Sequence, residues 1–345
     1  MQAYFLTQYG PSETAFQLRE VKRPSPGEGH LLIHTEAFGL NFAEVMARKG
    51  MYPDSPELPF IPGYDLVGRV VEVGPGVDPT WIGKRVASMV RFGSYAEYCV
   101  ASMHGIAEIP EDMPAGEAAA LCVQYATAWH CAIQCLHLMP GHKVLVHAAA
   151  GGVGTALVQL CKWKGCEVYG TAGSDEKCQI ALDNGADHMV NYRKEDYAKV
   201  LHAQLGREKL DATFNAVAGK TFKKDLKLLG AGGRLVLFGA ASRTNRKRGK
   251  WGTIRLLWEM GLIIPLTFVG SSKGVIGVNI LRIGDYRPQL LAEALDSLVK
   301  LCEEGVLKPR VGAVYPASQL AQAHTHLESR RSSGKIILTW DSPAT

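Results

Sequence analysis

The stretch VLVHAAAGGVGTALVQLCKWKG, residues 144–165, decides the fold class of this chain. Apolar residues typical of a buried strand lead into a glycine-rich turn, and the turn leads directly into a helical pattern that Gly165 closes. In a turn of this AxxGxxG form, the first glycines let the backbone approach a pyrophosphate, and the last lets the helix pack closely on the strand. A purely structural turn is the alternative, but the pattern that follows favours a nucleotide. We therefore predict that a dinucleotide is bound by Ala150, Gly151, Gly152, Val153 and Gly154.

Short apolar strands separated by helical patterns continue from this turn to about residue 240. This alternation predicts βαβ units and an α/β fold with a doubly wound parallel sheet of the Rossmann type. Up to about Pro110, short β-rich runs alternate with turns, which is typical of a partly open barrel or sandwich. The final strand, GKIILTW, resembles that first region. We expect one domain over residues 1–122, completed by residues 279–345, and a dinucleotide-binding domain over residues 123–278.

The composition fits a globular protein that has no nucleic-acid partner. The 345 residues are 47% hydrophobic, and the net charge of +5 is small and dispersed. The eight cysteines form no CxxC pair, so we expect reduced thiols and a cytoplasmic protein. The start, MQAYFLTQYG, lacks the pattern of a signal peptide, and no apolar run is long enough for a transmembrane helix.

The end of the second predicted strand favours NADPH over NADH. NAD-binding sheets place a carboxylate there for the ribose hydroxyls, but this chain reads Gly170-Thr171-Ala172-Gly173-Ser174. Asp175 and Glu176 come slightly later, where they suit the start of a helix. The alternative is an ordinary solvated helix start. The residues that we expect around the adenosine ribose and its 2′-phosphate are Thr171, Ser174, Lys177 and Tyr192, with Arg193 beside them.

Several ordered motifs resemble the medium-chain dehydrogenase/reductase superfamily, and within it the quinone oxidoreductases of the ζ-crystallin type. They are AFGLNFAEVMARKGMYP, LPFIPGYDLVGRVVEVGPGV, GSYAEYCVAS, AAAGGVGTALVQL and SSGKIILTW. The resemblance implies a GroES-like catalytic domain beside the Rossmann domain. In the zinc-dependent branch a cysteine and a histidine bind the metal, whereas this chain has Asn41 and Tyr64 in those regions. Since a phenol is a poor zinc ligand, we predict no metal. The pair His324 and His326 is interpreted as solvated.

The resemblance also implies the chemistry and further site residues. Without a metal, hydride transfer from NADPH to a quinone or an α,β-unsaturated carbonyl fits best. Asn41, Tyr52 and Thr127 match family positions around the nicotinamide or the acceptor. Each also has a structural interpretation, as a turn residue, a surface aromatic and a helix-start residue. Further cofactor contacts carry over to Asn215, Phe238, Gly239, Ser333 and Lys335, and the family commonly forms homodimers.

Residues 243–268 form a basic and apolar insert, which reads RTNRKRGKWGTIRLLWEMGLIIPLTF. A charged loop followed by an amphipathic helix is one interpretation. The other is an element that binds an anionic membrane surface, with cations near the headgroups and tryptophans at the interface. The insert resembles the vesicle amine transport protein branch of the quinone oxidoreductase-like group. Two alternative functions therefore stay open: a nucleotide-regulated, membrane-associated lipid-binding protein with little catalysis, and an enoyl reductase of lipid or polyketide metabolism.

Overall fold

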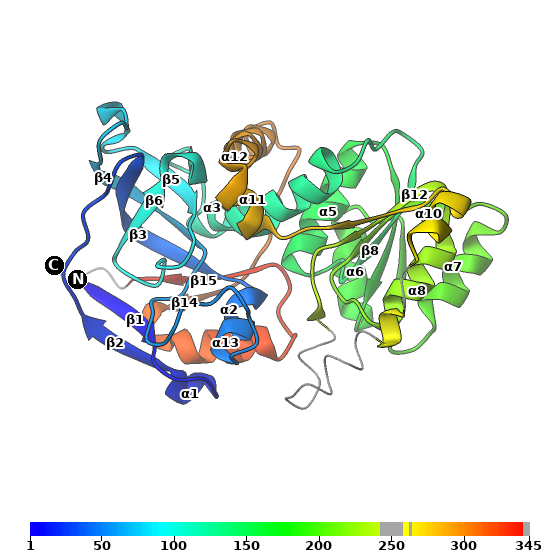
Figure 1. The fold of residues 1–345 in the computed structure, drawn as a ribbon, viewed down its shortest axis with the longest axis horizontal. Helices are drawn as coiled ribbons and strands as arrows, with labels where there is room; N and C mark the ends of the chain where they lie inside the picture. The colour runs from blue at the N-terminus through cyan, green and yellow to red at the C-terminus, as the bar shows by residue number, and fades with distance from the viewer. Residues whose placement is uncertain (242–257, 262–263, 341–345) are drawn as a thin grey trace. The chain divides into compact units, whose positions relative to one another are not determined.

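The computed structural model describes residues 1–241, 258–261 and 264–340. The chain forms two compact units, one of Met1–Ala126 with Ile280–Thr345 and one of Thr127–Asn279, and each has its own sheet (Figure 1). Among the described residues, no helix is both long enough and apolar enough to cross a bilayer.

The unit Thr127–Asn279 is built on a six-stranded sheet whose neighbouring strands all run parallel. The strand order β10-β9-β8-β11-β12-β13 starts at the centre with β8 and winds outward in both directions. This is the order of the Rossmann fold, so the predicted doubly wound α/β architecture is confirmed. The strands are β8 (Lys143–His147), β9 (Glu167–Ala172), β10 (His188–Asn191), β11 (Leu210–Asn215), β12 (Leu229–Leu237) and β13 (Gly274–Gly277).

Helices cover both faces of this sheet (Figure 1). Alternation along β8 points Leu145 toward the face covered by α7 and α8, where it shares a core with Leu201 and Phe222. The long helix α5 packs on β8 and β9 and follows the glycine turn directly. The helices whose bounds lie within the described residues of this unit are α4 (Ala126–Trp129), η4 (His130–Gln134), α5 (Gly152–Trp163), α6 (Asp175–Asp183), α7 (Tyr197–Leu205), α8 (Lys220–Leu228) and α10 (Pro265–Ser271).

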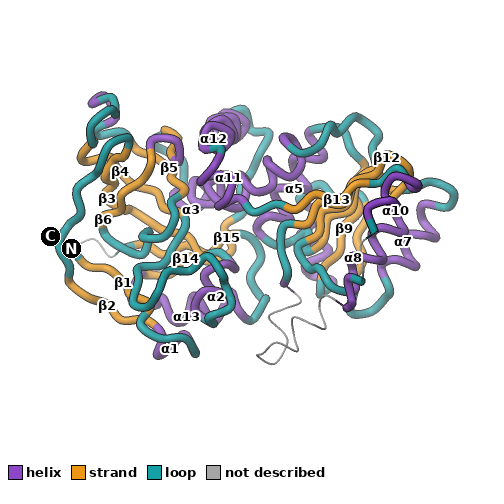
Figure 2. Tube along the Cα trace, viewed as in Figure 1, coloured by secondary structure: helices purple, strands orange, loops and turns teal. Residues whose placement is uncertain are grey.

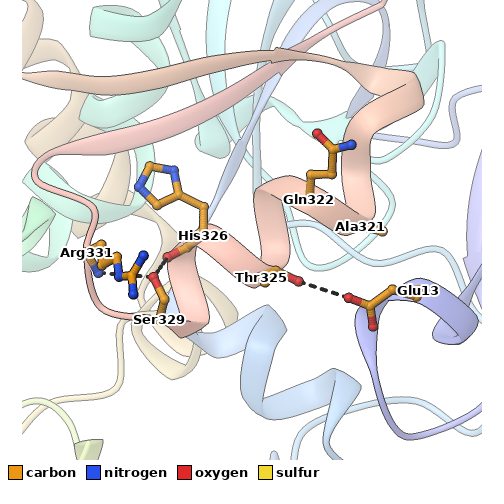
Figure 3. A pocket seen from close by; sticks show the side chains of 7 residues that line it. All are labelled: Glu13, Ala321, Gln322, Thr325, His326, Ser329 and Arg331. Carbon is orange, nitrogen blue, oxygen red and sulfur yellow. Dashed lines mark hydrogen bonds between the residues drawn. The ribbon is translucent and has the colours of Figure 1, made fainter.

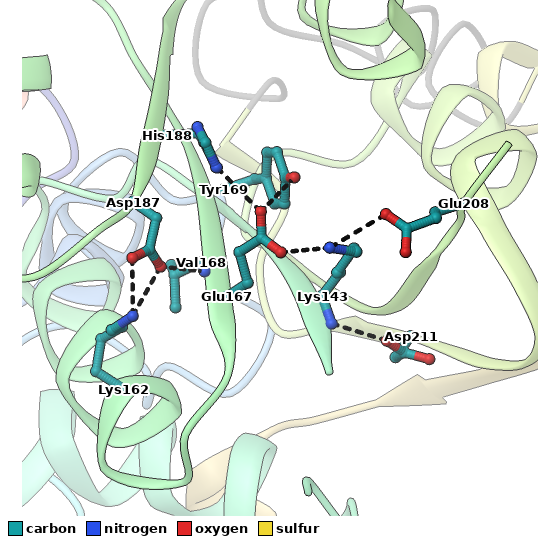
Figure 4. A network of polar contacts seen from close by, with 9 residues as sticks. All are labelled: Lys143, Lys162, Glu167, Val168, Tyr169, Asp187, His188, Glu208 and Asp211. Atoms are coloured by element: carbon teal, nitrogen blue, oxygen red, sulfur yellow. Dashed lines mark hydrogen bonds and ion pairs between the residues drawn. The ribbon is translucent and has the colours of Figure 1, made fainter. Parts of the chain in front are cut away.

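A network of charged groups ties the amino ends of the strands together (Figure 4). Lys143, the first residue of β8, forms ion pairs with Glu167, the first residue of β9, and with Glu208 at 3.3 Å. Glu167 also accepts hydrogen bonds from Tyr169 at 2.7 Å and His188 at 3.0 Å. The hydrogen bonds from Lys143 and Tyr169 lower the pKa of Glu167 to about 2. Since these contacts are all used within the unit, we interpret this edge as structural, and the opposite edge carries the glycine turn.

The other unit contains a seven-stranded mixed sheet and a separate β1–β2 hairpin (Figure 2). The strand order is β14-β15-β3-β4-β5-β7, with β6 also paired to β3. Strand β15, near the end of the chain, inserts antiparallel beside β3 and parallel to β14. The strands are β1 (Gln2–Leu6), β2 (Phe16–Glu20), β3 (His30–Leu40), β4 (Asp65–Val73), β5 (Arg85–Met89), β6 (Tyr98–Ser102), β7 (Ile106–Glu108), β14 (Val311–Pro316) and β15 (Lys335–Thr339).

The helices of this unit flank its sheet. Helix α13 packs on α1 and α2, and α12 packs on β7 and η2. Buried side chains of β3, β4 and β15 make the centre of the core, including Phe38, Leu66 and Leu338. The helices are α1 (Ser12–Ala15), α2 (Phe42–Arg48), η1 (Pro79–Trp81), η2 (Met103–Gly105), α3 (Ala115–Ala120), η3 (Leu121–Tyr125), α11 (Ile280–Tyr286), α12 (Pro288–Glu303), η6 (Ala317–Gln319) and α13 (Leu320–Glu328).

Candidate functional site

The glycine turn joins β8 to α5 and leaves the start of that helix open. Gly151 is the N-cap of α5, and no side chain of the described residues caps this helix. The first amide groups of the helix have no intrahelical acceptor. A Cβ at Gly154 would lie 2.1 Å from the carbonyl oxygen of Ala148, so packing alone requires a glycine there. Gly151 has an ordinary φ of −84°, and a Cβ there would meet only one atom, at 3.2 Å. Packing explains Gly154 better than Gly151, and the open amides suit an anion.

The ends of β9 and β10 bring several of the predicted residues together. Ser174 caps α6, and its Oγ accepts a hydrogen bond from the backbone N–H of Lys177 at 3.3 Å. A Cβ on Gly173 would lie 2.7 Å from the hydroxyl of Tyr192 and 3.5 Å from Nε of Arg193, so these side chains fold over the end of β9. Burial, together with the positive charge of Arg193, lowers the pKa of Lys177. Lys177, Tyr192 and Arg193 therefore lie close to the end of β9, the region in which the sequence predicts a 2′-phosphate.

The carboxylate of Asp175 bonds to residues at the end of β10 and in the loop that follows it. Asp175 forms an ion pair with Lys194 and accepts a hydrogen bond from Asn191 at 2.8 Å. These contacts direct it toward the start of α7 and explain why the pKa of the Asp175 carboxyl is lowered. Asp175 is also the first residue of α6, which agrees with its interpretation as a charge at the start of that helix.

The other predicted residues of this unit lie at or just after the carboxyl ends of its strands, except Thr127, which is the first residue of the unit. Thr171 and Asn215 are buried, and their side chains bond to protein groups inside the unit. The backbone N–H of Phe238 donates to the carbonyl oxygen of Asn215 at 3.1 Å, and a Cβ on Gly239 would lie 2.9 Å from that of Ala216. Thr127 is buried in α4.

A buried polar cluster in the unit of Met1–Ala126 with Ile280–Thr345 is centred on Asn41, at the start of α2. Its Nδ2 donates to Oδ2 of Asp65 at 2.7 Å, and its Oδ1 accepts from Nζ of Lys335 at 2.9 Å. Nζ of Lys335 also lies 2.5 Å from Oδ2 of Asp65, and both charged side chains are fully buried. The resemblance implied a cofactor contact for Lys335, whereas the structure directs its ammonium group to Asp65 and Asn41. Ser333 precedes β15, and its carbonyl oxygen closely approaches Gly312.

Glu44 closes this cluster. One carboxylate oxygen accepts from the backbone N–H of Asn41 at 2.6 Å, the other from its Nδ2 at 3.3 Å. Burial and the neighbouring charge of Asp65 raise the pKa of Glu44 to about 8. Glu44 therefore holds its proton at pH 7, and the cluster carries one negative and one positive charge.

Tyr52 and Tyr64 form an aromatic group with Phe92 in the same unit. The rings of Tyr52 and Tyr64 are 6.2 Å apart at 63°, and those of Tyr64 and Phe92 are 4.9 Å apart. The hydroxyl of Tyr64 is buried and makes no hydrogen bond to the described residues. Burial raises the pKa of Tyr52 to about 12, so it is a neutral hydrogen-bond donor at pH 7.

Among the described residues, no group of three His, Cys, Asp or Glu side chains could hold a metal ion. His324 is fully buried beside Tyr95, and burial lowers its pKa to about 3. His326 instead bonds to Tyr315 at 3.0 Å, so the two histidines of α13 point to different partners. The prediction that both are solvated is wrong for His324, because α13 presents that position to the core.

An open hollow over α1 and α13 is lined by Glu13, Thr325, His326, Ser329 and Arg331, among others (Figure 3). Oγ1 of Thr325 donates to Glu13 at 3.3 Å, and Oγ of Ser329 donates to the carbonyl of His326 at 2.7 Å. The polar groups of the hollow thus bond to one another, and we assign it no role.

The cysteine thiols are unpaired and chemically quiet. All eight are free, and burial raises the pKa of each, to about 12 for Cys99 and Cys302 and about 11 for Cys166. None of them has the lowered pKa of a catalytic nucleophile.

Sequence reasoning missed four charged or titratable residues. They are Glu44, Asp65 as the partner of Lys335, His147, which bonds to Thr171, and Asp225, which accepts a hydrogen bond from Asn215. The spacing Asn41-x-x-Glu44 is a capping-box signal and could have indicated Glu44. Nothing local marks the others, because their partners are far away in the sequence.

Comparison with known proteins places the chain among oxidoreductases. Residues 27–111 match the family model described as alcohol dehydrogenase GroES-like domain, and residues 152–273 match the one described as zinc-binding dehydrogenase. The synaptic vesicle membrane protein VAT-1 homolog of Mus musculus is 34% identical over 331 residues, which cover 95% of this chain and 81% of the relative. The quinone oxidoreductase of Homo sapiens is 32% identical over 340 residues, covering 98% and 97% of the two chains.

A solved structure agrees with these relatives. Escherichia coli quinone oxidoreductase complexed with NADPH superposes with a TM-score of 0.86 at 28% identity, covering 98% of this chain and all of the other. The chain therefore belongs to the medium-chain dehydrogenase/reductase superfamily, in the zinc-independent quinone oxidoreductase-like group and its VAT-1 branch.

Proposed function

We propose that this protein is an NADPH-dependent reductase that transfers hydride to a quinone or an α,β-unsaturated carbonyl. Two features of the Rossmann unit carry the proposal. One is the open N-terminus of α5, and the other is the presence of Lys177 and Arg193 just after the ends of β9 and β10. The first suits a pyrophosphate and the second a 2′-phosphate. The quinone oxidoreductase relatives, one of them solved with NADPH, support the same cofactor.

Tyr52 is the residue that we propose to touch the acceptor. NADPH supplies the hydride when bound, and negative charge then develops on the acceptor oxygen. A phenol that stays protonated at pH 7 can donate a hydrogen bond to that oxygen and stabilise the charge. The Nδ2 hydrogens of Asn41 go to Asp65 and Glu44, so Asn41 would act by holding the buried cluster in place. Thr127 would contribute from the start of the Rossmann unit. No metal step is needed for this chemistry, and stoichiometric zinc in the purified protein would contradict the proposal.

The test follows oxidation of NADPH and NADH against a panel of quinones and short enones. We expect turnover with NADPH strongly preferred. Lys177→Ala and Arg193→Ala should raise KM for NADPH by about ten-fold each, while the exposed Lys199→Ala should not. Equal KM values for NADPH and NADH would refute the assignment of these cations. An enoyl reductase of lipid or polyketide metabolism would show itself in the same panel by preferring acyl enone acceptors.

Tyr52→Phe tests the acceptor site separately. Loss of one hydrogen bond to the developing charge should lower kcat by about 100-fold with little change in KM for NADPH. Tyr286→Phe is the matched control, since Tyr286 is 74% exposed. Unchanged turnover of the Tyr52 variant would remove it from the mechanism.

A second candidate function is peripheral binding to an anionic membrane. Residues 243–257, which hold the basic cluster, lie outside the described residues. The neighbouring described segment exposes large apolar side chains, with Trp258 83% and Leu266 and Val269 each 77% exposed. Side chains of this kind suit a membrane interface. Flotation with vesicles that contain phosphatidylserine should recover the protein, and Trp258→Ser with Leu266→Ser should abolish recovery while NADPH oxidation continues. No preference for anionic over neutral vesicles would refute this function.

We also propose that the protein is a homodimer. Strand β13 is the last strand in the order of its sheet, and a second copy could pair along that edge. Light scattering on the eluted protein should give twice the mass of the chain, and a monomer mass would refute the proposal.

A further inference from the structure

Asp225 is a fully buried carboxylate on α8 that no proposed catalytic step uses. Nε2 of His147 lies 3.0 Å from both of its oxygens, and the hydroxyl of Tyr197 donates to Oδ1 at 2.8 Å. Nδ2 of Asn215 donates to Oδ2 at 2.6 Å. Because a carboxylate can only accept, Nε2 of His147 carries its hydrogen, and three donors converge on one anion.

These donors come from different parts of the dinucleotide-binding edge. His147 is the last residue of β8 and immediately precedes the glycine turn, while Asn215 is the last residue of β11. His147 also bonds through Nδ1 to Oγ1 of Thr171 on β9, at 3.1 Å. Asp225 thus joins the carboxyl ends of three adjacent strands to α7 and α8.

The loops that leave these strand ends are strained. Ala148, directly after His147, has φ +53°, and Ala218, three residues after Asn215, has φ +60°. A left-handed alanine is strained and must be held by its surroundings. Oδ1 of Asn215 accepts from the backbone N–H groups of Val217 and Ala218 at 2.8 and 2.9 Å. Nδ2 of Asn215 donates both to Asp225 and to Oγ1 of Thr221, at 2.9 Å, so these two residues together hold the amide and the loop that it shapes.

We propose that Asp225 is a positioning residue for the dinucleotide, which holds the pyrophosphate turn after His147 and the loop after Asn215 in register from beneath the sheet. Asp225 itself touches no cofactor. The inference rests on the proposed NADPH function. Thr171 and Asn215 were predicted to contact the cofactor, but their side chains bond to His147 and Asp225. Under this proposal they shape the loops whose backbone contacts the cofactor.

The test compares Asp225→Asn with the wild type in two binding measurements. The asparagine side chain has the volume of the aspartate, but one of its two oxygens becomes an N–H donor. That donor faces the donor of a neighbouring side chain, and the resulting repulsion displaces the loops. We expect the Kd for NADPH to rise about ten-fold or more. Adenosine 2′-monophosphate lacks the pyrophosphate and the nicotinamide, and its proposed partners Lys177 and Arg193 lie outside the network, so its Kd should change by about two-fold or less.

Controls separate positioning from general destabilisation. Phe222→Leu removes volume from the core beside the same helix but takes no hydrogen bond from the network, and should lower Tm while leaving the Kd for NADPH unchanged. If Asp225→Asn does not fold, Tyr197→Phe removes a single donor and should give a smaller rise in the same direction. Hydrogen exchange of the free protein should show residues 148–151 and 216–219 opening together in either variant.

The outcomes are distinguishable. A wild type that fails to bind NADPH overturns the proposed function. A wild type that binds NADPH, with variants whose Kd and loop exchange are unchanged, overturns the role of Asp225 alone. Equal weakening of NADPH and adenosine 2′-monophosphate also overturns it, because that would indicate general loss of structure.

Discussion

Replacing Lys335 by methionine should destabilise the protein by about 3–5 kcal/mol, because it leaves a buried carboxylate without its cation. The ammonium nitrogen lies 2.5 Å from Oδ2 of Asp65, and neither side chain is exposed. Methionine keeps most of the apolar stem, so the packing loss is small beside the electrostatic one. The site cannot relax toward β3, because a Cβ on Gly39 would lie 2.1 Å from Asp65 and 2.2 Å from Lys335.

Urea unfolding followed by tryptophan fluorescence measures this loss, and Tm should fall by on the order of 10 °C. Lys300→Met is the control, since its side chain is 75% exposed and its contact with Glu304 is 4.0 Å long, so its effect should stay within about 0.5 kcal/mol. Adding Asp65→Asn to Lys335→Met removes both charges and should recover part of the loss. A loss below about 1 kcal/mol for Lys335→Met alone would refute the reasoning.

Three further predictions concern pH and the glycine turn. The folded protein keeps a proton on Glu44 up to about pH 8, whereas the unfolded chain releases it near pH 4.5. The free energy of unfolding therefore falls as pH rises between these values, and Glu44→Gln should make Tm less dependent on pH over that range. His324 stays neutral in the folded protein down to about pH 3, whereas the unfolded chain protonates it near pH 6.5. The free energy of unfolding therefore falls as pH drops below about 6.5, and His324→Phe should reduce the loss of Tm at pH 4. Gly154→Ala drives a Cβ to 2.1 Å from Ala148 and should abolish NADPH binding in a titration, whereas Gly277→Ala, which meets no atom within 4 Å, should not. A variant that matched the wild type in its own assay would contradict the corresponding prediction.

The Rossmann unit could be predicted because its signals are local. The strand before Ala148, the turn at Gly151–Gly154 and the helix after it follow one another within some twenty residues, and each signal depends only on its neighbours. The cation group at Lys177 and Arg193 was also within reach, because parallel strands bring their carboxyl ends to one edge.

The buried networks could not be predicted in the same way. Lys335 and Asn41 are 294 residues apart, and His147 and Asp225 are 78 apart. A single charged residue in an amphipathic helix, such as Asp225 in α8, is predicted from the sequence pattern to face solvent. Only the packing of the helix on the sheet shows that this side chain is buried. The same holds for His324, which the pattern assigned to solvent and the packing of α13 assigned to the core.

The buried thiols have a consequence for a protein that is proposed to hold quinones and enones. Such acceptors are electrophiles that add to thiolates far faster than to thiols. At pH 7 a thiol with the pKa of Cys166, about 11, is ionised in only about one molecule in ten thousand. Eight cysteines are present and the pKa of every one is raised. The raised pKa values therefore slow alkylation of these thiols by the compounds that the protein is proposed to reduce.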